Sequence, residues 1–458
     1  MYDVAIIGAG PAGIFTALEL VDNRPDLKVV MLEKGEEVEK RVCPRVERAT
    51  GCLHCSPCFV VSGWGGAGAF SDGKVTLTSE FGGFLHQYVP RHLVDDLIFY
   101  VDRTYVRFGA TNVVYGTDEA VIRELKKKAA TAGLDLVPAQ IRHLGTENCA
   151  RILKNMRDYL EGKVEVRTRT PVATIVARDD TALSVVTARG EEIRARYIVA
   201  APGREGAEWF TSQARQLNLK LANNPVDIGV RVELPAVVME HLTEPIYESK
   251  LIYYSKAFDD PIRTFCMCPH GEVVMENNAG LITVNGHSFE GKKTENTNFA
   301  ILVSKTFTEP FKEPIAYGKY IASLANMLGG GVLVQRLGDL LSGRRSTEKR
   351  IQKGMVRPTM PEATPGDLSL VLPYRHLINI LEMLEALDKI APGVYNRSTL
   401  LYGVEVKFYS SRLEVNSELE TRIKNLFVAG DGAGITRGLA QASASGVHVA
   451  RQILKRVR

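Results

Sequence analysis

Cysteines gather close to the start of the chain at spacings that suit metal binding or redox chemistry. Cys52, Cys55 and Cys58 form a Cys-x2-Cys-x2-Cys run, and Cys43 stands upstream, directly before a proline. Three interpretations stay open: a [4Fe-4S] cluster held by four thiolates, a zinc site held by four thiolates or with His54 replacing one of them, and a redox disulfide. Ferredoxin-type runs place the Cys-Pro pair after the other cysteines rather than before them. We rank metal ahead of the disulfide.

Two further stretches alternate residues that can do chemistry. Cys266 and Cys268 are separated by one residue, as are Glu405, Lys407 and Tyr409. In a β-strand, residues two apart point to the same face. The first pair predicts either redox-active thiols or small apolar side chains of a sheet core. The second set predicts either a proton donor and a cation at a reactive site, or a half-exposed strand with its polar residues outward.

The first 35 residues predict how a nucleotide is held. An apolar run, 3–7, leads into Gly8–Gly13, then into a stretch of helical spacing, and a second apolar run ends at Glu33. This is the βαβ dinucleotide-binding fingerprint, in which the glycines allow a tight turn, close approach of a pyrophosphate and close helix packing. The acidic residue accepts hydrogen bonds from a ribose diol. The predicted nucleotide-binding residues here are Gly8, Gly10, Pro11, Ala12, Gly13, Glu33 and Lys34.

Two later segments predict further contacts with the cofactor. A glycine-rich loop, 63–73, offers backbone N–H groups and two polar side chains. A strand at 421–430 ends in Gly430-Asp431 ahead of a helix, which places a carboxylate where a polyol can be held and N–H groups at the far end of an extended cofactor. The predicted residues in these segments are Gly65, Gly66, Ala67, Ser71, Asp72, Gly430, Asp431, Arg437, Gly438 and Leu439.

Regular elements are expected around these segments. Apolar spacing predicts helices over 90–108, 118–132, 146–161, 314–328, 374–390 and 439–454. Strands are expected at 164–166, 172–176, 184–187, 196–203, 228–234, 251–255, 264–268, 272–275 and 299–303, with no helix over 225–310. The lysines at 126–128 suit a solvated helix face, and the stretch 336–366 reads as a long loop.

Composition narrows the class of protein. The chain has 458 residues, 45% of them hydrophobic and 24% charged, with a net charge of +4 and seven cysteines. These values are ordinary for a soluble globular protein, and the small charge gives no reason to expect nucleic acid as a partner. No apolar stretch is long enough to span a membrane. The fingerprint begins almost at Met1, so we expect no signal peptide and a cytoplasmic location.

The pattern Thr421-x4-Leu-Phe-Val-Ala-Gly-Asp431, together with the fingerprint and the Ala201-x-Gly203 turn, resembles the FAD-dependent oxidoreductases of the glutathione-reductase-like superfamily. Several stretches are similar, more narrowly, to a group of bacterial and archaeal FAD-dependent dehydrogenases. These stretches are the cysteine run, 65–74, 264–269, 405–409 and 430–434. The resemblance implies an α/β fold, with a Rossmann-like FAD-binding domain assembled from both chain ends and the middle and an inserted β-rich α+β substrate domain.

The resemblance also implies domain bounds and residue roles. The FAD-binding domain would comprise 1–90, with the cysteine-rich loop 43–58 and the loop 63–73, then 163–205 and 401–458, with a helical insertion at 91–162 and a β-rich domain at 206–400. Val172, Ala201 and Gly203 would join the cofactor site. Cys266, Cys268, Lys407 and Tyr409 are the candidate catalytic residues, and Cys43, Cys52, Cys55 and Cys58 the candidate metal ligands.

The expected function is therefore that of a FAD-dependent oxidoreductase, moving hydride or electrons between a small molecule and flavin N5 in a pocket between the two domains. The alternative is an electron-transfer or redox-sensing flavoprotein that acts with a protein partner. A flavin-dependent RNA-modifying enzyme is a third candidate, disfavoured by the small net charge. There is no second Gly-x-Gly-x-x-Gly after a strand, so a separate NAD(P)H domain is not expected. The substrate, the electron donor (a protein or NAD(P)H) and the oligomeric state stay open.

Overall fold

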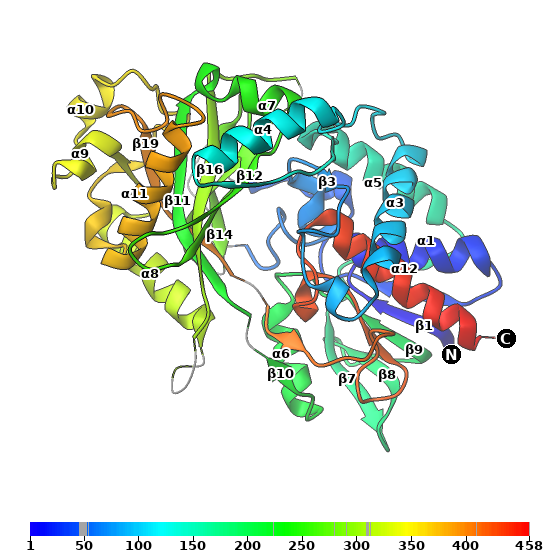
Figure 1. Ribbon diagram of the computed structural model, residues 1–458. Helices are drawn as coiled ribbons and strands as arrows, with labels where there is room; N and C mark the ends of the chain where they lie inside the picture. The colour runs from blue at the N-terminus through cyan, green and yellow to red at the C-terminus, as the bar shows by residue number, and fades with distance from the viewer. Residues whose placement is uncertain are drawn as a thin grey trace. The chain divides into compact units, whose positions relative to one another are not determined.

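The computed structural model describes residues 1–44, 53, 55–222, 224–278, 280–289, 291–307, 311, 313–408 and 410–457. Its backbone divides into two compact units, each made of separate stretches of chain (Figure 1). Unit 1 comprises residues 1–113, 142–224 and 409–458. Unit 2 comprises residues 114–141 and 225–408.

Unit 1 is built on a parallel sheet whose strands come from the beginning, middle and end of the chain. The order is β6-β2-β1-β9-β21, and each neighbouring pair is parallel. The first part of β9 also carries an antiparallel extension, β8 and then β7. The bounds are β1 Tyr2–Ile7, β2 Val29–Leu32, β6 Glu165–Arg167, β7 Val172–Arg178, β8 Thr181–Thr187, β9 Glu192–Ala200 and β21 Leu426–Val428.

Two helices from opposite ends of the chain, α1 (Pro11–Asn23) and α12 (Leu439–Arg456), pack against one another in unit 1. The hydroxyl of Thr16 donates to the carbonyl of Ala12 at 2.8 Å and to that of Gly446 at 3.1 Å, so the backbones lie very close. The other elements of unit 1 are η1 Val38–Lys40, η2 Gly66–Phe70, β3 Lys74–Thr76, η3 Leu85–Gln87, α3 Arg91–Arg107, α5 Thr146–Leu160, α6 Ala207–Gln216, β10 Leu221–Ala222, β20 Arg412–Leu413 and η6 Asp431–Ala433. Strand β5, Ile141–His143, spans the division between the units.

Unit 2 is a sheet in the order β18-β17-β19-β11-β16-β13-β12-β4, antiparallel except for the parallel β17–β18 pair. Its central strands β11 and β16 are buried along nearly their whole length, and the buried residues of β11 include the charged Asp227, Arg231 and Glu233. The bounds are β4 Asp135–Val137, β11 Val226–Pro235, β12 Lys250–Tyr254, β13 Pro261–Cys268, β16 Asn296–Lys305, β17 Leu333–Arg336, β18 Thr364–Pro365 and β19 Leu400–Lys407.

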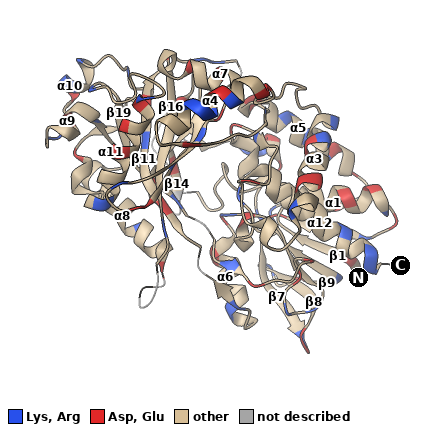
Figure 2. Cartoon of the chain, in the orientation of Figure 1, with Lys and Arg blue, Asp and Glu red and all other residues tan. Residues whose placement is uncertain are grey.

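A hairpin and several helices complete unit 2. They are β14 Glu272–Asn278, β15 Leu281–His287, α4 Glu119–Thr131, η4 Ala236–Val238, α7 Glu240–Ile246, α8 Pro314–Gly329, α9 Leu337–Leu341, α10 Glu348–Gln352, η5 Leu368–Leu370 and α11 Tyr374–Asp388. Figure 2 marks charged residues along α4, and the lysines at 126–128 are exposed as expected.

The six predicted helices are all present, and most predicted strands lie within two or three residues of their expected bounds. Two expectations are wrong. The stretch 225–310 contains the short helix α7, and 336–366 is not one loop, because it holds α9, α10 and β18. Such short helices carry too few turns to show an apolar period. Within the described ranges, no helix has both the length and the apolar character needed to cross a lipid bilayer.

The unit bounds differ from the predicted domain bounds. The compact unit that contains the large antiparallel sheet begins at 225 rather than 206 and ends at 408 rather than 400. The stretch 91–162, predicted as one helical insertion, is divided: 114–141, with α4 and β4, belongs to unit 2 because β4 pairs with β12 at the edge of its sheet.

Candidate functional site

The turn between β1 and α1 has a backbone that only glycine can supply. Gly8 has φ +99°, and a Cβ on it would lie 2.3 Å from the carbonyl oxygen of Ala201. A Cβ on Gly13 would lie 2.0 Å from the carbonyl oxygen of Gly8. The first contact brings the predicted Ala201–Gly203 turn against the fingerprint, and the second packs the start of α1 against the end of β1.

Gly10 differs from Gly8 and Gly13, because a side chain at this position would point into open space. A Cβ there would meet nothing nearer than the Cα of Gly66, at 4.0 Å. Gly10 precedes Pro11, the first residue of α1, and caps that helix without a side-chain hydrogen bond. The first N–H groups of a helix have no partner within the helix, and they favour an anion. The open position and these donors, which include the N–H groups of Ala12 and Gly13, fit a dinucleotide pyrophosphate.

Glu33, at the end of β2, organises the backbone around this turn. Its buried carboxylate accepts hydrogen bonds from the N–H groups of Ala9 at 2.8 Å, Gly35 at 2.9 Å and Gly63 at 3.0 Å. It therefore joins the fingerprint to the glycine-rich loop, a role that the sequence did not suggest. The neighbouring Lys34 forms an ion pair with Glu205, and burial lowers the pKa of Lys34.

The glycine-rich loop 63–73 lies against the beginnings of both α1 and α12. The N–H of Gly65 donates to the carbonyl of Ala9 at 2.8 Å. A Cβ on Gly68 would lie 2.8 Å from Leu439 and 3.5 Å from Pro11. Three segments that are distant in the sequence thus meet here: the glycine-rich loop, the start of α1 and the start of α12. Gly66 and Ala67 belong to η2 within that loop.

The two polar side chains predicted in this loop make local contacts. Ser71 donates to the carbonyl of Gly68 at 3.1 Å and accepts from the N–H of Gly73 at 3.2 Å. The carboxylate of Asp72 lies 3.0 Å from the ammonium of Lys74. Both side chains therefore help to shape the loop, and their predicted contacts with the cofactor stay predictions.

Arg41 is a structural residue of the site that sequence reasoning missed. Its buried guanidinium donates to four carbonyls, those of Phe59 at 2.9 Å, Val60 at 2.7 Å, Trp64 at 2.6 Å and Gly66 at 2.9 Å. Burial lowers its pKa to about 10. One side chain thereby fixes much of the loop that carries Gly65 and Gly66. No local pattern in the sequence distinguishes Arg41 from the chain's other arginines.

Asp431 is half-buried at the start of η6, close to the beginning of α12. It accepts hydrogen bonds from the hydroxyl of Thr436 at 2.7 Å and from the N–H of Gly438 at 3.2 Å, and burial raises its pKa. A Cβ on Gly432 would lie 2.5 Å from the carbonyl oxygen of Gly203, so the Gly430-Asp431 segment packs on the Ala201–Gly203 turn.

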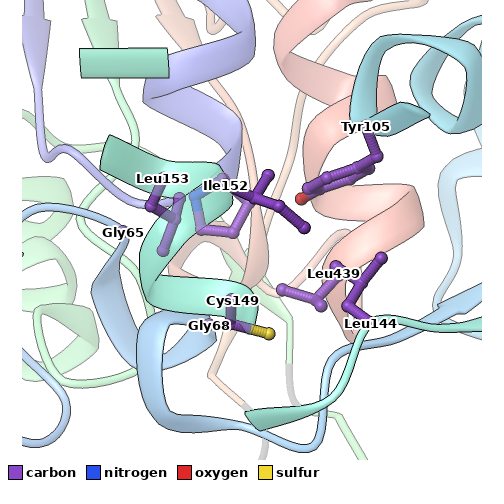
Figure 3. Close-up of a pocket in the computed structure, with 9 residues that line it drawn as sticks. Gly65, Gly68, Tyr105, Leu144, Cys149, Ile152, Leu153 and Leu439 are labelled. Carbon is purple, nitrogen blue, oxygen red and sulfur yellow. The ribbon is translucent and has the colours of Figure 1, made fainter. Parts of the chain in front are cut away.

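The remaining predicted cofactor residues lie near the same segments. The N–H of Arg437 donates to the carbonyl of Gly82 at 2.7 Å, and its guanidinium stands 4.6 Å from the ring centre of Phe84. Val172 begins β7, just after Thr170, whose N–H donates to the carbonyl of Glu33 at 2.8 Å. Pro11, Gly65, Gly68 and Leu439 line a small apolar pocket that Tyr105, Leu144, Cys149, Ile152 and Leu153 complete (Figure 3).

The cysteine-rich loop gives no metal centre within the described residues. Cys43, Cys55 and Cys58 are half-buried free thiols and are not among the described side chains whose ligand atoms converge within 4.8 Å. Cys52 and His54 lie outside the described residues. The predicted cluster or zinc site on Cys43, Cys52, Cys55 and Cys58 therefore stays a prediction.

Unit 2 contains a buried charged network centred on Arg231 of β11. Its guanidinium donates to both carboxylate oxygens of Glu405, at 2.8 and 3.2 Å, and to the side-chain oxygen of Asn298 at 2.6 Å. The ammonium of Lys407 lies 2.9 Å from the same carboxylate. Burial favours the neutral acid, but the two cations outweigh it and lower the pKa of Glu405. The expectation of a half-exposed strand is wrong, because all of β19 is buried.

The candidate thiols lie in the same network. The guanidinium of Arg231 donates to the carbonyl of Cys266 at 3.1 Å and lies 3.9 Å from the sulfur of Cys268. A β-bulge interrupts the simple alternation expected for this strand. Lys407, Cys266 and Cys268 are therefore brought together, whereas Tyr409 lies outside the described residues.

Parts of the chain resemble known proteins and protein families. Residues 225–408 match the family model described as FAD-dependent protein, C-terminal domain-like, and residues 3–79 match that of lycopene cyclase protein. An uncharacterised protein of Clostridium beijerinckii is 28% identical over 98% of this chain and 80% of its own length. The mitochondrial L-2-hydroxyglutarate dehydrogenase of Dictyostelium discoideum is 40% identical over 55 residues, 12% of each protein.

Solved structures give only distant matches. Glycine oxidase from Bacillus cereus is 12% identical at a TM-score of 0.40, covering 100% of this chain and 96% of its own. L-proline dehydrogenase from P. horikoshii is 12% identical at a TM-score of 0.42, and the match covers 99% of this chain and 94% of that one. Likenesses this weak carry no argument. The match to the FAD-dependent family model confirms two predictions: the cofactor is FAD, and the protein is a FAD-dependent oxidoreductase.

Proposed function

We propose that unit 1 binds one FAD in an extended form and that the chain moves a hydride or an electron pair between flavin N5 and a small molecule. The observation that carries this proposal is that three segments meet the fingerprint turn: the glycine-rich loop near Gly10, the Ala201–Gly203 turn at Gly8, and the Gly430-Asp431 segment at Ala12. This packing leaves the open position at Gly10 next to the backbone donors at the N-terminus of α1. The assignment to the glutathione-reductase-like superfamily belongs to the same proposal.

Each segment has a proposed part in holding the cofactor. The N-terminus of α1 takes the pyrophosphate, and Glu33, whose carboxylate has lone pairs beyond its three backbone bonds, takes the ribose. Asp431 takes the ribityl chain, and the N-terminus of α12 faces the ring. FAD supplies the hydride chemistry, while the protein binds, orients and tunes it. Lys407 is proposed to hold a proton for the substrate, beside the carboxylate of Glu405.

Gly10→Ala tests cofactor binding without disturbing the fold. Gly10 has φ −80° and ψ −177°, which alanine adopts freely, and the new methyl group would touch no protein atom closer than 4.0 Å. We expect the free energy of unfolding of the apoprotein to change by less than about 0.5 kcal/mol. FAD affinity should fall by about tenfold or more, because the methyl group occupies space proposed for the pyrophosphate.

Gly331→Ala is the matched control, since a Cβ there would also have room, with its nearest neighbour 3.7 Å away in unit 2. FAD binding is measured by fluorescence titration of the apoprotein. Equal FAD affinity in the Gly10 variant, the control and the unaltered chain would contradict the proposed site.

Anaerobic reduction of the bound flavin distinguishes the two kinds of oxidoreductase. A substrate enzyme should be reduced by one member of a panel of 2-hydroxy acids, the substrate class in the name of the Dictyostelium discoideum relative. Reduction by a reduced ferredoxin or dithiol protein alone, with no metabolite turned over, would instead favour the electron-transfer alternative.

A further inference from the structure

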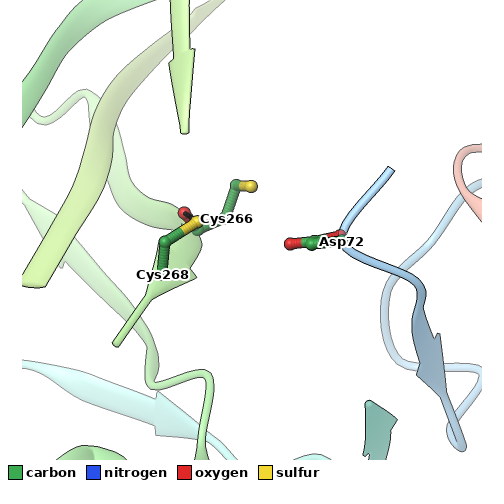
Figure 4. Close-up of side chains that lie close together, drawn as sticks. All are labelled: Asp72, Cys266 and Cys268. Carbon is green, nitrogen blue, oxygen red and sulfur yellow. Dashed lines mark hydrogen bonds between the residues drawn. The ribbon is translucent and has the colours of Figure 1, made fainter. Parts of the chain in front are cut away.

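Two thiols at the end of β13 form a pair in unit 2. The sulfur atoms of Cys266 and Cys268 lie within 4.8 Å of one another, and both side chains are drawn in Figure 4. We propose that they form a reversible intramolecular disulfide, a two-electron redox site whose oxidant is a low-molecular-weight disulfide. The proposal does not depend on the cofactor or on the substrate of the flavin.

The backbone is bent where such a bond needs it. In an extended strand, two residues separated by one other lie about 6.6–7.2 Å apart, at or beyond the Cα separation that a disulfide tolerates, about 4.4–6.8 Å. Here Phe265 pairs with Ala300 and Cys268 with Asn298, so two residues of β13 oppose one of β16. Cys266 has φ +47°, a left-handed conformation outside the strand region. This β-bulge brings the two sulfurs toward each other.

Arg231 supplies the electrostatic setting. Its guanidinium lies 3.9 Å from the sulfur of Cys268 and also contacts the carbonyl of Cys266 at 3.1 Å. A neighbouring cation favours the thiolate form of a sulfur, which is the nucleophile in disulfide exchange. The carboxylate of Glu405 holds Arg231 in place and partly offsets its charge. Arg231 is therefore a positioning residue for the pair.

Exposure sets the order of events. Cys266 is half-buried and Cys268 is fully buried, so Cys266 meets the oxidant first. Its thiolate attacks one sulfur of the small disulfide, and one thiolate leaves. The thiolate of Cys268 then attacks the Cys266 sulfur of the mixed disulfide, and the second small thiolate leaves. The two protons of the protein thiols end on the two small thiols, so one disulfide is exchanged for another.

Thiol trapping in glutathione buffers tests this sequence on the flavin-loaded full chain. After alkylation, trypsin releases 264–292, a peptide that contains Cys266 and Cys268 and no other cysteine. We expect this peptide to change from doubly alkylated to internally bonded as the share of oxidised glutathione rises, and to return on reduction. Peptide 143–151 is the internal control, because burial raises the pKa of its Cys149 to about 12 and should keep that thiol reduced.

Two serine variants separate the steps. Cys268→Ser should accumulate one glutathione on Cys266, and Cys266→Ser should leave the buried Cys268 unmodified; an unchanged urea unfolding midpoint shows that each still folds. A peptide that stays doubly alkylated in every buffer overturns the proposal. So does stable glutathione on Cys266 of the unaltered chain, since Cys268 would then not resolve it. Neither readout uses flavin turnover, so a failed substrate assay leaves this inference standing.

Discussion

At the scale of single residues, buried polar side chains of this protein serve to fix backbone as well as to neutralise charge. Arg41 binds four carbonyl oxygens, and Glu33 accepts from three backbone N–H groups. Both act on the loops that surround Gly10. Because a charged group strengthens each such hydrogen bond, one substitution here is expected to affect several segments together.

Arg41→Lys tests this role. A lysine ammonium has three donors and cannot reproduce the planar arrangement that reaches four carbonyls, so buried acceptors would be left without donors. We expect the free energy of unfolding to fall by about 2 kcal/mol or more. Arg194→Lys is the control, since the Arg194 side chain is 71% exposed and 3.5 Å from its partner Glu192. Urea denaturation measures both, and equal small losses would contradict the assigned role.

His376 of α11 gives a pH-dependent stability. Its ring is buried, neither ring nitrogen has a hydrogen-bond partner in the described part of the chain, and burial lowers its pKa from 6.5 to about 4. Between these two pH values His376 is therefore protonated in the unfolded chain but neutral in the folded chain. The part of the stability that depends on His376 should be complete above about pH 7.5 and should be lost as pH decreases through 6.5 toward 4, by at most about 1.4 kcal/mol per pH unit.

His376→Leu should flatten this part of the stability profile while leaving stability at pH 7.5 within about 1.5 kcal/mol, because an apolar side chain loses no hydrogen bond there. Lys305, Asp260 and Arg375 face the ring, but Asp260, strongly ion-paired, titrates at lower pH. Urea midpoints at several pH values measure the profile. An identical slope between pH 6.5 and 4.5 in both proteins would rule out His376 as its source.

At the scale of elements, the contact between α1 and α12 joins the two ends of the chain. Thr16 and Gly446 meet at the crossing, where a Cβ on Gly446 would lie 2.1 Å from the carbonyl oxygen of Ala12. Helices that cross this closely admit no methyl group without moving apart. Movement would shift both helix N-termini, and with them the proposed pyrophosphate and ring contacts.

Gly446→Ala should therefore lower both stability and cofactor affinity. We expect a loss of about 1–3 kcal/mol in unfolding free energy from overpacking, and weaker FAD binding, although residue 446 is not itself a proposed contact. Gly331→Ala again serves as the control, because its Cβ has room. Thermal denaturation of the apoprotein and FAD titration give the two quantities. Normal stability together with normal affinity would show that the crossing tolerates a methyl group.

At the scale of the whole molecule, unit 1 is assembled from three separated stretches of chain, and the proposed cofactor contacts come from all three. A ligand that binds only the folded state stabilises it by mass action, by about 2.7 kcal/mol at a free concentration one hundred times its dissociation constant. FAD should thus be a major source of stability for a unit whose parts are far apart in the sequence.

Removing FAD should lower the melting temperature of the unaltered chain by several degrees, and adding it back should restore the temperature in a concentration-dependent way. Differential scanning calorimetry measures the shift. Gly10→Ala should need about tenfold more FAD for the same rise. A melting temperature that does not change with FAD concentration would contradict binding of FAD by the folded state.

The sequence alone determined the features that arise from local patterns. Apolar periodicity located α3, α4, α5, α8, α11 and α12. The spacing Gly8–Gly13 with Glu33, together with the Gly430-Asp431 element, indicated the cofactor. These features depend on backbone conformation within a few residues, so each segment of the sequence encodes its own local conformation.

Only the tertiary structure showed what depends on contacts between distant residues. Arg41 became part of the site through carbonyls of residues 59–66. Strand β19 became buried because β15 and α8 pack against it between its partners β11 and β17. The stretch 114–141 joined unit 2 through the pairing of β4 with β12. Burial, pKa shifts and bent strands depend on residues that are close in space. The sequence of one segment does not specify which distant residues will lie next to it.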